Sequence, residues 1–536
     1  MKNQYPELKN KLISVSFRLL LLTAFLPVLS TCSTTQSVPG NTLTDGLCAD
    51  APSYDIISLP LEQRQDVMKV KGKTTQWAVV KYSLAEYKGK EITIHISADV
   101  KREGAAGNLI WQVNNSDYPS LSYLENAPAG VWHHMRGRRI LTPTDSDPYI
   151  YLTNWENNAA KTVYYIDNFT VTIEEGNMME PDLTLPQLKS AYKNDFLIGN
   201  IIDMTYAAGK YFDLLKHHYN VVTTTETYPV QLAPSEKGGE YKWTRADAVI
   251  ELARSNGILL HGHILAWHES SPAWLTSGTR AEVEQNLKDY ITTVLTHFKG
   301  KYISWDVVNE AMQENPTAGD WKKCVRNTEN PWYNKLGPDY IEIAFRAARA
   351  ADPDITLYYN DYFHMDGYYS QDSIKHAFNK IEAVRKMIDD INTRYRNETG
   401  GTRNLIEGVG IQSHHFGFGL NLNNLRECLE KFSTLGIEMA ISELDISVTG
   451  FARGSGNDTD MSEADEIAQA KLYAGLFKLY REYSSYISRV TWWGMDDGTS
   501  WLSPGNPCLF NWKLEAKKAF YAVSDPDAFL AGYANN

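Results

Sequence analysis

The chain has 536 residues, more than one average domain, and so predicts two or three folded units. Hydrophobic residues make up 43% and aromatic residues 12%, including 14 Trp and 32 Tyr, so the units can bury sizeable cores and present flat rings to a ligand. The net charge of −13 disfavours nucleic acid or another polyanion as a partner. A neutral substrate is compatible with this balance.

The first 31 residues have the pattern of an export signal. Basic residues precede an apolar run, residues 19–29, which is too short to span a bilayer as a mature helix. The run leads into LSTC, which resembles a bacterial lipoprotein box ending at Cys32. We therefore expect export to the bacterial cell envelope and outer-membrane anchoring only through a lipid on Cys32. The alternative is ordinary signal cleavage, giving a secreted or periplasmic protein.

A small, polar stretch at residues 33–49 predicts a linker. Residues 50–176 then show short alternating runs, such as EITIHISADV and TVYYIDNFTVTI, separated by turn residues. This pattern is typical of an antiparallel β-sandwich, here a jelly-roll-like module. The four cysteines after Cys32 are widely spaced and form neither a metal-binding pattern nor a disulfide framework.

From residue 187 to 536, strand-like runs alternate with amphipathic helices eight times. In chain order the strand-like runs are FLIGNII, YNVVTT, LLHGHILAWH, ISWDVVNE, ITLYYNDY, IEGVGIQSH, EMAISELDI and RVTWWGMDD. Eightfold βα alternation predicts a closed parallel (β/α)8 barrel, the TIM barrel. The chain is thus predicted to be multidomain, with a β-sandwich before a TIM barrel whose chemistry lies at the carboxyl ends of the strands.

Two carboxylates occupy such strand ends. The fourth strand ends at Asn309-Glu310, and the seventh carries Glu443. Glycoside hydrolysis needs a pair of this kind, because one carboxyl protonates the leaving oxygen while the other attacks the anomeric carbon or activates water. Carboxyl groups about 5 Å apart give retention of configuration, and a separation of about 6.5 Å or more gives inversion. Spacing along the chain leaves these two outcomes open.

Other strand ends carry side chains suited to sugars. Trp rings stack on sugar faces, whereas Gln, His and Asn bond hydroxyls. The candidates are His263, Trp267 and His268 on strand three, Asn360, Asp361 and Tyr362 on strand five, Gln412 and His414 on strand six, and Trp493 and Trp501 on or after strand eight. Their shared position at one end of the predicted barrel favours a role in binding.

Six ordered motifs in the barrel region resemble those of family-10 glycoside hydrolases, mostly endo-β-1,4-xylanases. They are GHILAWH, WDVVNEAM, YYNDY, GIQSHH, ISELDIS and TWWGMDDGTSW. The resemblance implies a retaining enzyme on β-1,4-xylan, with Glu310 as acid/base and Glu443 as nucleophile. It also implies that Asn309 holds a sugar 2-hydroxyl and that His414, steadied by Asp445, supports the nucleophile. The glycone side would be lined by His263, Trp267, His268, Gln412, Trp493 and Trp501. No cofactor is implied, and we expect a monomer.

Two departures from the family pattern affect the glycone side. After strand two the family usually shows Thr-x-Glu-Asn-x-Met-Lys, whereas this chain reads TTTETYPVQL, with Glu226 but without the Asn and Lys. After Trp267-His268 the family often has Ser-Gln, and here Glu269-Ser270 follow. Glycone binding should be weaker or differently aimed, which favours decorated xylan or another β-glycan as substrate. The fifth helix and its following loop also look longer than the family needs.

The sandwich resembles secreted carbohydrate-binding modules in VYYIDNFTVTI and GVWHHMRG. This implies that residues 50–176 hold a β-glycan near the barrel. Trp132 is expected in the core. Trp111, Tyr118 and Trp155 are the candidates for stacking on sugar.

Three alternatives remain. His261-x-His263 on one strand can be read as a metal pair, but metallohydrolase barrels resembling amidohydrolases carry that pair on the first strand, which has no His here. The site is therefore predicted to hold no metal. A surface lipoprotein could instead capture glycan with a catalytically weak barrel, although intact Glu310 and Glu443 argue against this. A β-glucanase on the same barrel is the nearest enzymatic alternative.

Overall fold

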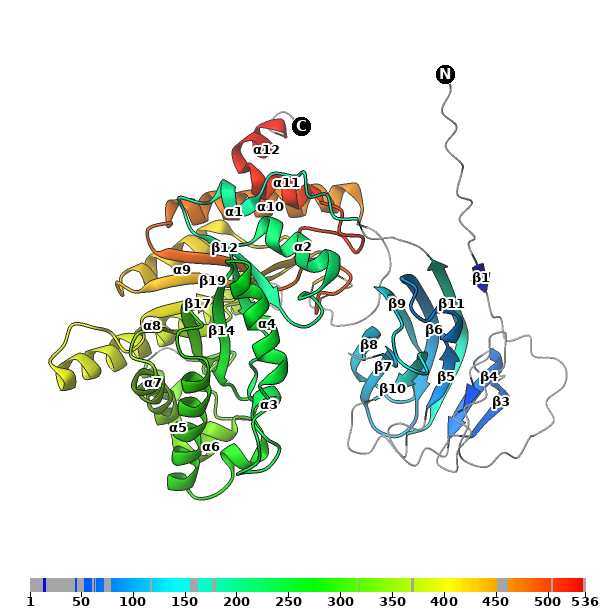
Figure 1. Ribbon diagram of the computed structural model, residues 1–536, viewed down its shortest axis with the longest axis horizontal. Coiled ribbons are helices and arrows are strands. Elements are labelled where there is room, and N and C mark those ends of the chain that lie inside the picture. Colours follow the sequence, from blue (N-terminus) through cyan, green and yellow to red (C-terminus); the bar gives the residue numbers. More distant parts are fainter. Residues whose placement is uncertain are drawn as a thin grey trace. The chain divides into compact units, whose positions relative to one another are not determined.

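The structure is a computed structural model that describes residues 13–15, 44–45, 53–59, 62, 64–71, 79–115, 118–154, 162–175, 180–317, 319–367, 371–450, 461–502 and 505–533. Cys32, nearly all of the predicted signal and most of the predicted linker lie outside the described residues. The chain divides into two compact units (Figure 1). Within the ranges given above, no helix is both long and apolar enough to cross a membrane.

The first unit is a sandwich of two antiparallel sheets, which confirms the predicted fold. One sheet has the order β3-β4-β11-β6-β9, with β1 paired to β11, and the other has the order β2-β5-β10-β7-β8. The strands are β1 (Ile13–Val15), β2 (Thr44–Asp45), β3 (Ser53–Leu59), β4 (Arg64–Lys71), β5 (Val80–Ser83), β6 (Ile92–Arg102), β7 (Gly107–Val113), β8 (Ser120–Ala127), β9 (His133–Leu141), β10 (Tyr149–Thr153) and β11 (Tyr164–Glu175), with a short helix η2 (Ala85–Tyr87).

The sandwich core follows from alternation along the strands. In β6, Ile94, Ile96 and Val100 lie on one face and are buried against residues of the other sheet. Trp111 of β7 belongs to the same core, where it is fully buried and its ring centroid lies 5.3 Å from that of Phe169. The prediction that Trp111 stacks on sugar is therefore wrong, because its face of β7 points between the sheets.

The three other aromatic predictions for the sandwich have different outcomes. Trp132 is partly exposed and is not a core residue, so that prediction is also wrong. The Arg64 guanidinium carbon lies 4.0 Å and the Lys101 ammonium 4.9 Å from the centroid of its ring. Tyr118 is 47% exposed and remains a candidate for contact with sugar. Trp155 lies outside the described residues.

The second unit is the predicted parallel barrel. The strand order is β17-β16-β15-β14-β13-β12-β20-β19, and β17 pairs with β19 to close the ring. The eight barrel strands are β12 (Leu197–Ile202), β13 (Val221–Thr224), β14 (Leu259–Ala266), β15 (Ser304–Asn309), β16 (Thr356–Asp361), β17 (Gly408–Ile411), β19 (Glu438–Ser447) and β20 (Ile487–Trp492). A short strand, β18 (His414–Phe416), pairs with the last part of β19.

Large side chains cover glycines of neighbouring strands, inside the barrel in the case of Tyr358 and on its helix side in the case of Trp305, which packs against Phe298. A Cβ on Gly262 would lie 2.1 Å from the Trp305 ring, and one on Gly408 would lie 2.3 Å from the Tyr358 ring. Both rings are fully buried. The barrel is therefore a packed core, and ligands can reach only its mouth.

Helices surround the barrel strands (Figure 1). They are α1 (Leu188–Ala191), α2 (Gly209–His218), α3 (Pro229–Leu232), α4 (Thr244–Ser255), α5 (Arg280–His297), α6 (Pro331–Leu336), α7 (Tyr340–Ala351), α8 (Gln371–Thr399), α9 (Leu422–Ser433), α10 (Glu463–Glu482), α11 (Lys518–Ser524) and α12 (Pro526–Gly532), with short turns of helix η4 (Ala273–Thr276), η5 (Trp321–Lys323) and η6 (Gly337–Asp339). In α7, for example, Ile341, Ala344 and Phe345 form the buried stripe.

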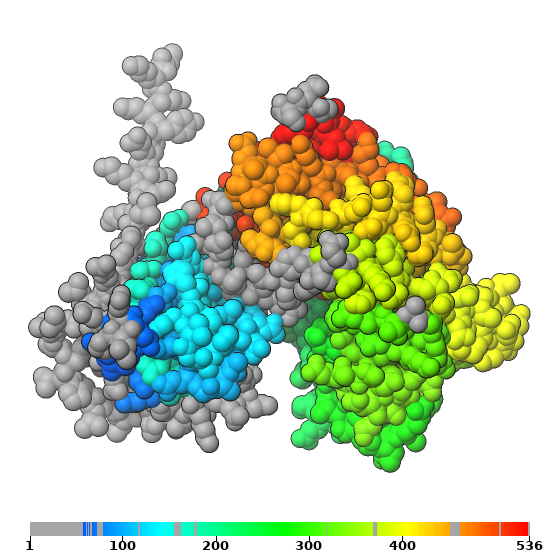
Figure 2. Space-filling model, turned by 180° about the vertical axis from the view of Figure 1, so that it is seen from behind, coloured from blue at the N-terminus to red at the C-terminus, as the bar shows by residue number. Residues whose placement is uncertain are grey.

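Helix α8 is longer than its sequence pattern predicted. Apolar spacing in the sequence predicts a helix over about residues 373–394, whereas the helix runs from Gln371 to Thr399. Its C-terminal part, in yellow, projects from the rest of the barrel unit (Figure 2). The extension is polar and exposed at its end, so it had no apolar stripe by which to be recognised.

Candidate active site

Glu310 follows the last residue of β15, where the backbone turns sharply. Its φ of 54° lies in the left-handed region, which is rare for a residue with a side chain. A hydrogen bond from its backbone N–H to the Asn360 carbonyl, 2.9 Å long, holds this conformation. The carboxylate accepts two bonds from neutral donors, the Trp267 indole N–H at 2.9 Å and the Gln412 amide at 2.8 Å. The side chain is half-buried.

Glu443 lies inside β19 and is more deeply buried, with 5% of its surface exposed. Its Oε1 accepts a hydrogen bond of 2.7 Å from the Asn360 amide. Its Oε2 lies 3.3 Å from Nε2 of His414. Glu443 is thus held by one amide and one imidazole, both from neighbouring segments of the barrel mouth.

Three amides connect the two carboxylates. Asn360 donates to Glu443 and, at 2.9 Å, to Oδ1 of Asn309, and Gln412 donates to the same Oδ1 at 3.4 Å and to Glu310. Asn360 is fixed in turn by Ser442, whose hydroxyl donates to its Oδ1 at 2.6 Å. The network joins the ends of β15, β16, β17 and β19, so the closure of the barrel sets the relative position of the carboxyl groups.

His414 is charged and lies between two carboxylates. Its Nδ1 is 3.0 Å from Oδ1 of Asp445, on the side opposite Glu443. Burial works to lower the pKa of His414, but Asp445 and Glu443 outweigh it and raise the pKa to about 10. Register explains the pairing, because His414 and Asp445 are partners between β18 and β19. The imidazolium therefore places a positive charge beside Glu443 at neutral pH.

The two histidines of β14 share one buried carboxylate. Oδ2 of Asp306 lies 2.8 Å from Nδ1 of His263 and 3.0 Å from Nε2 of His261. Burial raises the pKa of Asp306, but the two histidines outweigh it and hold the pKa well below its usual range. Burial and the nearby Arg489 lower the pKa of His261 to about 4. Hydrogen bonding accounts for the His-x-His pair, and among the described residues no cluster of three or more His, Cys, Asp or Glu could hold a metal ion.

The predicted aromatic residues are only partly brought together. The ring of Trp493 lies edge-on to His263, with 5.2 Å between centroids, and the ring of His268 lies 5.8 Å from that of Trp267. Trp267 reaches the network through its bond to Glu310. Trp501 lies further along, in the turn after β20, and is partly exposed, so its place in the cleft stays a prediction.

The departure after strand two has a structural consequence. Glu226 is buried, and its carboxylate forms a two-pronged ion pair with Arg245 of α4, at 2.8 and 2.9 Å. It also accepts a bond from the backbone N–H of Met204 at 3.2 Å. The carboxylate is thus engaged by protein groups. In place of the polar pattern, Tyr228 lies beside His263 and Trp267, with centroids 5.4 and 6.0 Å apart.

Sequence reasoning missed several contributors to the site. Asn360 was predicted only as a candidate for binding sugar hydroxyls, and its role in joining two strand ends depends on contacts with two other strands. Asp306 lies opposite His263 in the register of β14 and β15, which the paired pattern of the two strands could have shown. Tyr228 follows β13 in a segment without strand alternation, so the sequence did not indicate which way its side chain points.

The fold and the site define a class: a TIM barrel with two glutamates joined by amides at the carboxyl ends of its strands, the arrangement used for glycoside hydrolysis. The family model for glycosyl hydrolase family 10 matches residues 187–526. The chain belongs to this family.

Similar proteins include xylanases and one glucanase. The chain is 32% identical over 454 residues to "Endo-1,4-beta-xylanase A" of Thermoanaerobacterium saccharolyticum, covering 81% of this chain and 35% of that protein. It is 30% identical over 496 residues to "Exoglucanase XynX" of Acetivibrio thermocellus, covering 86% and 42%. A solved structure of the intracellular xylanase TsXylA of T. saccharolyticum, a mutant in complex with xylotriose, has a TM-score of 0.54 and 31% identity, covering 63% of this chain and 98% of that one. The chain spans about a third of the length of the first of these curated relatives.

Proposed function

We propose that the protein is a retaining endo-β-1,4-xylanase in which Glu310 is the acid/base and Glu443 the nucleophile. The observation that carries the proposal is the network of Gln412, Asn309 and Asn360, which fixes two glutamates in different surroundings at one barrel mouth. Xylanases among the relatives, one of them solved with xylotriose, support xylan as the substrate.

The first half of the reaction forms a covalent intermediate. Glu443 attacks the anomeric carbon, the glycosidic C–O bond breaks, and Glu310 gives its proton to the departing oxygen. His414 keeps a positive charge beside Glu443 and orients its carboxylate, while Asn360 holds the other oxygen. Asn309, fixed by two amides, would bind the 2-hydroxyl of the sugar being cleaved.

The second half reverses the role of Glu310. A water molecule gives a proton to Glu310 and its oxygen bonds to the anomeric carbon, which releases Glu443. The groups that bond the Glu310 carboxylate, Trp267 and Gln412, are neutral, so no ion pair breaks when a proton arrives. Two displacements at one carbon retain its configuration.

We also propose that sugar binding on the glycone side depends more on aromatic stacking than on hydrogen bonds. Glu226 is committed to Arg245, while Tyr228, Trp267 and Trp493 offer rings. Stacking tolerates substituents better than a closed set of hydrogen bonds, so we expect activity on decorated xylan. His263, which contacts Asp306 and the Trp493 ring, would orient the Trp493 ring. His268 would lie beside the Trp267 ring.

Two experiments test the function. The protein and Glu443→Ala would each be incubated with plain xylan, arabinoxylan and a β-glucan, and the products separated. We expect short xylo-oligosaccharides from the unmodified protein alone. Products from β-glucan alone would favour the β-glucanase alternative, for which the exoglucanase relative is the supporting observation. Polymer binding without products would favour glycan capture. NMR of the first product would then show whether the β-anomer forms initially, as retention requires.

The remaining proposals concern attachment. We propose that Cys32 carries the lipid and that the sandwich holds the polymer near the barrel. A Cys32→Ala variant should move from the membrane fraction to the soluble fraction, and deletion of residues 50–176 should weaken binding to xylan. Unchanged fractionation would contradict the anchor, and unchanged polymer affinity would contradict the role of the sandwich.

Sedimentation at several concentrations would test the expected monomer.

A further inference from the structure

Two hydrogen bonds flank the left-handed backbone of Glu310. The N–H of Glu310 donates to the Asn360 carbonyl at 2.9 Å. The N–H of the next residue, Ala311, donates to the Tyr359 hydroxyl at 3.1 Å. The first bond fixes the peptide plane before Glu310, and the second fixes the plane after it. Because these two planes set φ and ψ, the two bonds together set the direction in which the Glu310 side chain leaves the backbone.

The second of these bonds ends on a side chain. The Tyr359 hydroxyl can accept from Ala311 because it gives its own proton to Oδ2 of Asp361, at 2.5 Å. Burial raises the pKa of Tyr359, and the charge of Asp361 adds to this effect, so the phenol keeps its proton. A phenol that donates to a carboxylate is also a stronger acceptor. Tyr359 and Ala311 are fully buried, so bulk water does not compete for either bond.

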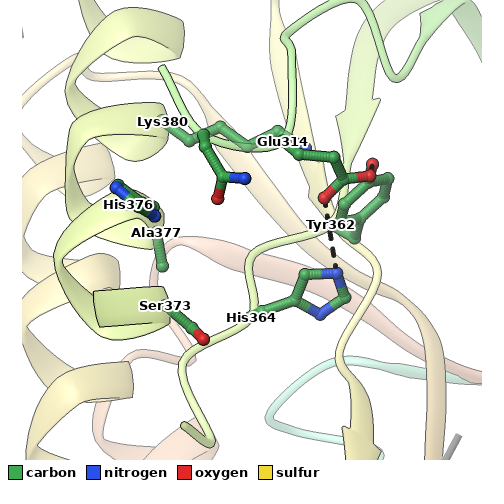
Figure 3. A pocket seen from close by; sticks show the side chains of 8 residues that line it. Glu314, Tyr362, His364, Ser373, His376, Ala377 and Lys380 are labelled. Atoms are coloured by element: carbon green, nitrogen blue, oxygen red, sulfur yellow. Dashed lines mark hydrogen bonds and ion pairs between the residues drawn. The ribbon is translucent and has the colours of Figure 1, made fainter. Parts of the chain in front are cut away.

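The Asp361 carboxylate is held by a buried cation. Nζ of Lys380 lies 2.8 Å from Oδ1 of Asp361, and the same oxygen accepts a bond of 2.9 Å from the backbone N–H of Tyr362. Lys380 reaches from α8 toward the segments that carry Glu314 and Tyr362 (Figure 3). Its ammonium lies 3.4 Å from the centroid of the Tyr362 ring. Burial raises the pKa of Asp361, and Lys380 opposes this effect.

A buried ion pair is by itself weak evidence of stability, because burying two charges often costs as much as their attraction returns. This pair is connected to the acid/base. Tyr359 links Asp361 to the peptide that follows Glu310. The charge of Glu310 also adds to the effect of burial in raising the pKa of Asp361. The two carboxylates therefore lie within electrostatic reach of each other, joined by one side chain and one peptide.

We propose that three buried side chains position the acid/base. They are Lys380, Asp361 and Tyr359. Through the N–H of Ala311 they hold the Glu310 carboxyl where it can protonate the leaving oxygen. This inference rests on the proposed function of Glu310. Since the three residues act through the acid/base, their removal should impair cleavage where the leaving group needs a proton and should have little effect where it does not.

The test uses two substrates that differ in how much the leaving group needs a proton. They are phenyl and dinitrophenyl β-xylobioside, because phenolate is a poor leaving group and dinitrophenolate is a good one. Tyr359→Phe keeps the ring and removes the hydroxyl. Because a misplaced general acid loses much of its contribution, we expect kcat/KM for the phenyl substrate to fall by about 10–100-fold. The value for the dinitrophenyl substrate should change little.

Tyr192→Phe is the matched control. Tyr192 is also fully buried, and its hydroxyl donates to the Val523 carbonyl at 2.6 Å. The same substitution thus removes one buried hydrogen bond elsewhere in the barrel unit. Both variants should lower Tm, whereas only Tyr359→Phe should change the ratio of the two kcat/KM values. A ratio that is unchanged in Tyr359→Phe, or that changes equally in both variants, would overturn the inference.

A double variant tests the ion pair. Asp361→Leu alone leaves Lys380 buried without its partner, so it is combined with Lys380→Met, which makes the site apolar at similar volume. The double variant should show the same selective loss on the phenyl substrate as Tyr359→Phe. The ratio of the unmodified protein in this variant would show that the ion pair serves only the fold. Failure of the unmodified protein to cleave either substrate would instead contradict the proposed function, on which the inference rests.

Discussion

The two glutamates of the site occupy unlike surroundings on the same barrel. Glu310 is half-buried at a strand end, and the partners of its carboxylate are the neutral N–H groups of Trp267 and Gln412. Glu443 is buried inside a strand, beside the charged imidazole of His414. The amides of Asn309, Asn360 and Gln412 lie between the two glutamates and join them through hydrogen bonds. One fold thus gives the same residue type a neutral environment and a cationic one.

This difference matches the difference in chemical task. A nucleophile must be ionised before it attacks, and a fixed cation beside it favours the charged form. An acid/base must gain and lose a proton within one turnover, which is easier when no ion pair has to be broken. Two carboxylates with distinct surroundings are therefore evidence of distinct roles, and each role can be tested separately.

Removal of Glu443, the proposed nucleophile, should have the largest effect. Glu443→Ala is expected to lower kcat on xylan by about 10⁴-fold or more, because no other group can form the covalent intermediate. Added azide should restore turnover of an aryl xyloside by occupying the vacated space, and the product should be the inverted α-glycosyl azide, identified by NMR. A β-azide from this variant would mean that the two roles are exchanged.

The effect of removing Glu310, the proposed acid/base, should depend on the leaving group. Glu310→Ala is expected to lower kcat on xylan by about 10²–10⁴-fold. An aryl xyloside with an acidic phenol should lose much less, since that leaving group needs no proton. Azide should here give the retained β-azide, because Glu443 still forms the intermediate. Equal losses on xylan and on the activated substrate would count against the assignment.

Neutralising His414 should remove the contrast between the two environments. His414→Gln keeps hydrogen-bonding capacity but not charge, and we expect kcat to fall by about 10–100-fold, the cost of leaving a buried charge without its partner. The pKa of His414 is raised from 6.5 to about 10 in the folded state, so its charge stabilises the fold fully below about pH 6.5. This stabilisation is lost as pH rises through about 10.

The difference in Tm between the unmodified protein and His414→Gln, measured from about pH 6 to 10.5, should therefore shrink as pH rises. A constant difference over that range would show that His414 acts by shape and packing alone. An Arg in place of His414 is not a usable control, because its longer side chain does not fit between Glu443 and Asp445.

The sequence was sufficient to predict the parts of the molecule that repeat. Eight strand-like runs with intervening helices define the barrel, and in a barrel every strand end faces one mouth, so Glu310 and Glu443 could be placed together without coordinates. Trp111 shows where this reasoning fails. Its run, NLIWQV, is apolar at Ile110 as well as at Leu109 and Trp111, so alternation did not tell which face of the strand is the core.

Strand two shows the same limit at the active site. Strand β13 ends at Thr224, so Glu226 and Tyr228 lie beyond the strand. No alternation along the chain therefore indicates which way their side chains point. The partner of Glu226 is Arg245 on α4, and this ion pair depends on how the helix packs. The direction of Tyr228 depends in turn on Thr227, whose hydroxyl donates to the His263 carbonyl at 2.6 Å.

Tyr228 should therefore give the smallest but most specific effect. An aromatic contact is worth about 0.5–1.5 kcal/mol, so Tyr228→Ala should raise KM for xylo-oligosaccharides by about 2–10-fold. The value of kcat should change little, since the ring contacts Trp267 and His263 rather than either carboxylate. Tyr228→Phe, which keeps the ring, should behave like the unmodified protein. If Phe is as poor as Ala, the hydroxyl carries the contact, and glycone binding remains polar despite the altered strand-two motif.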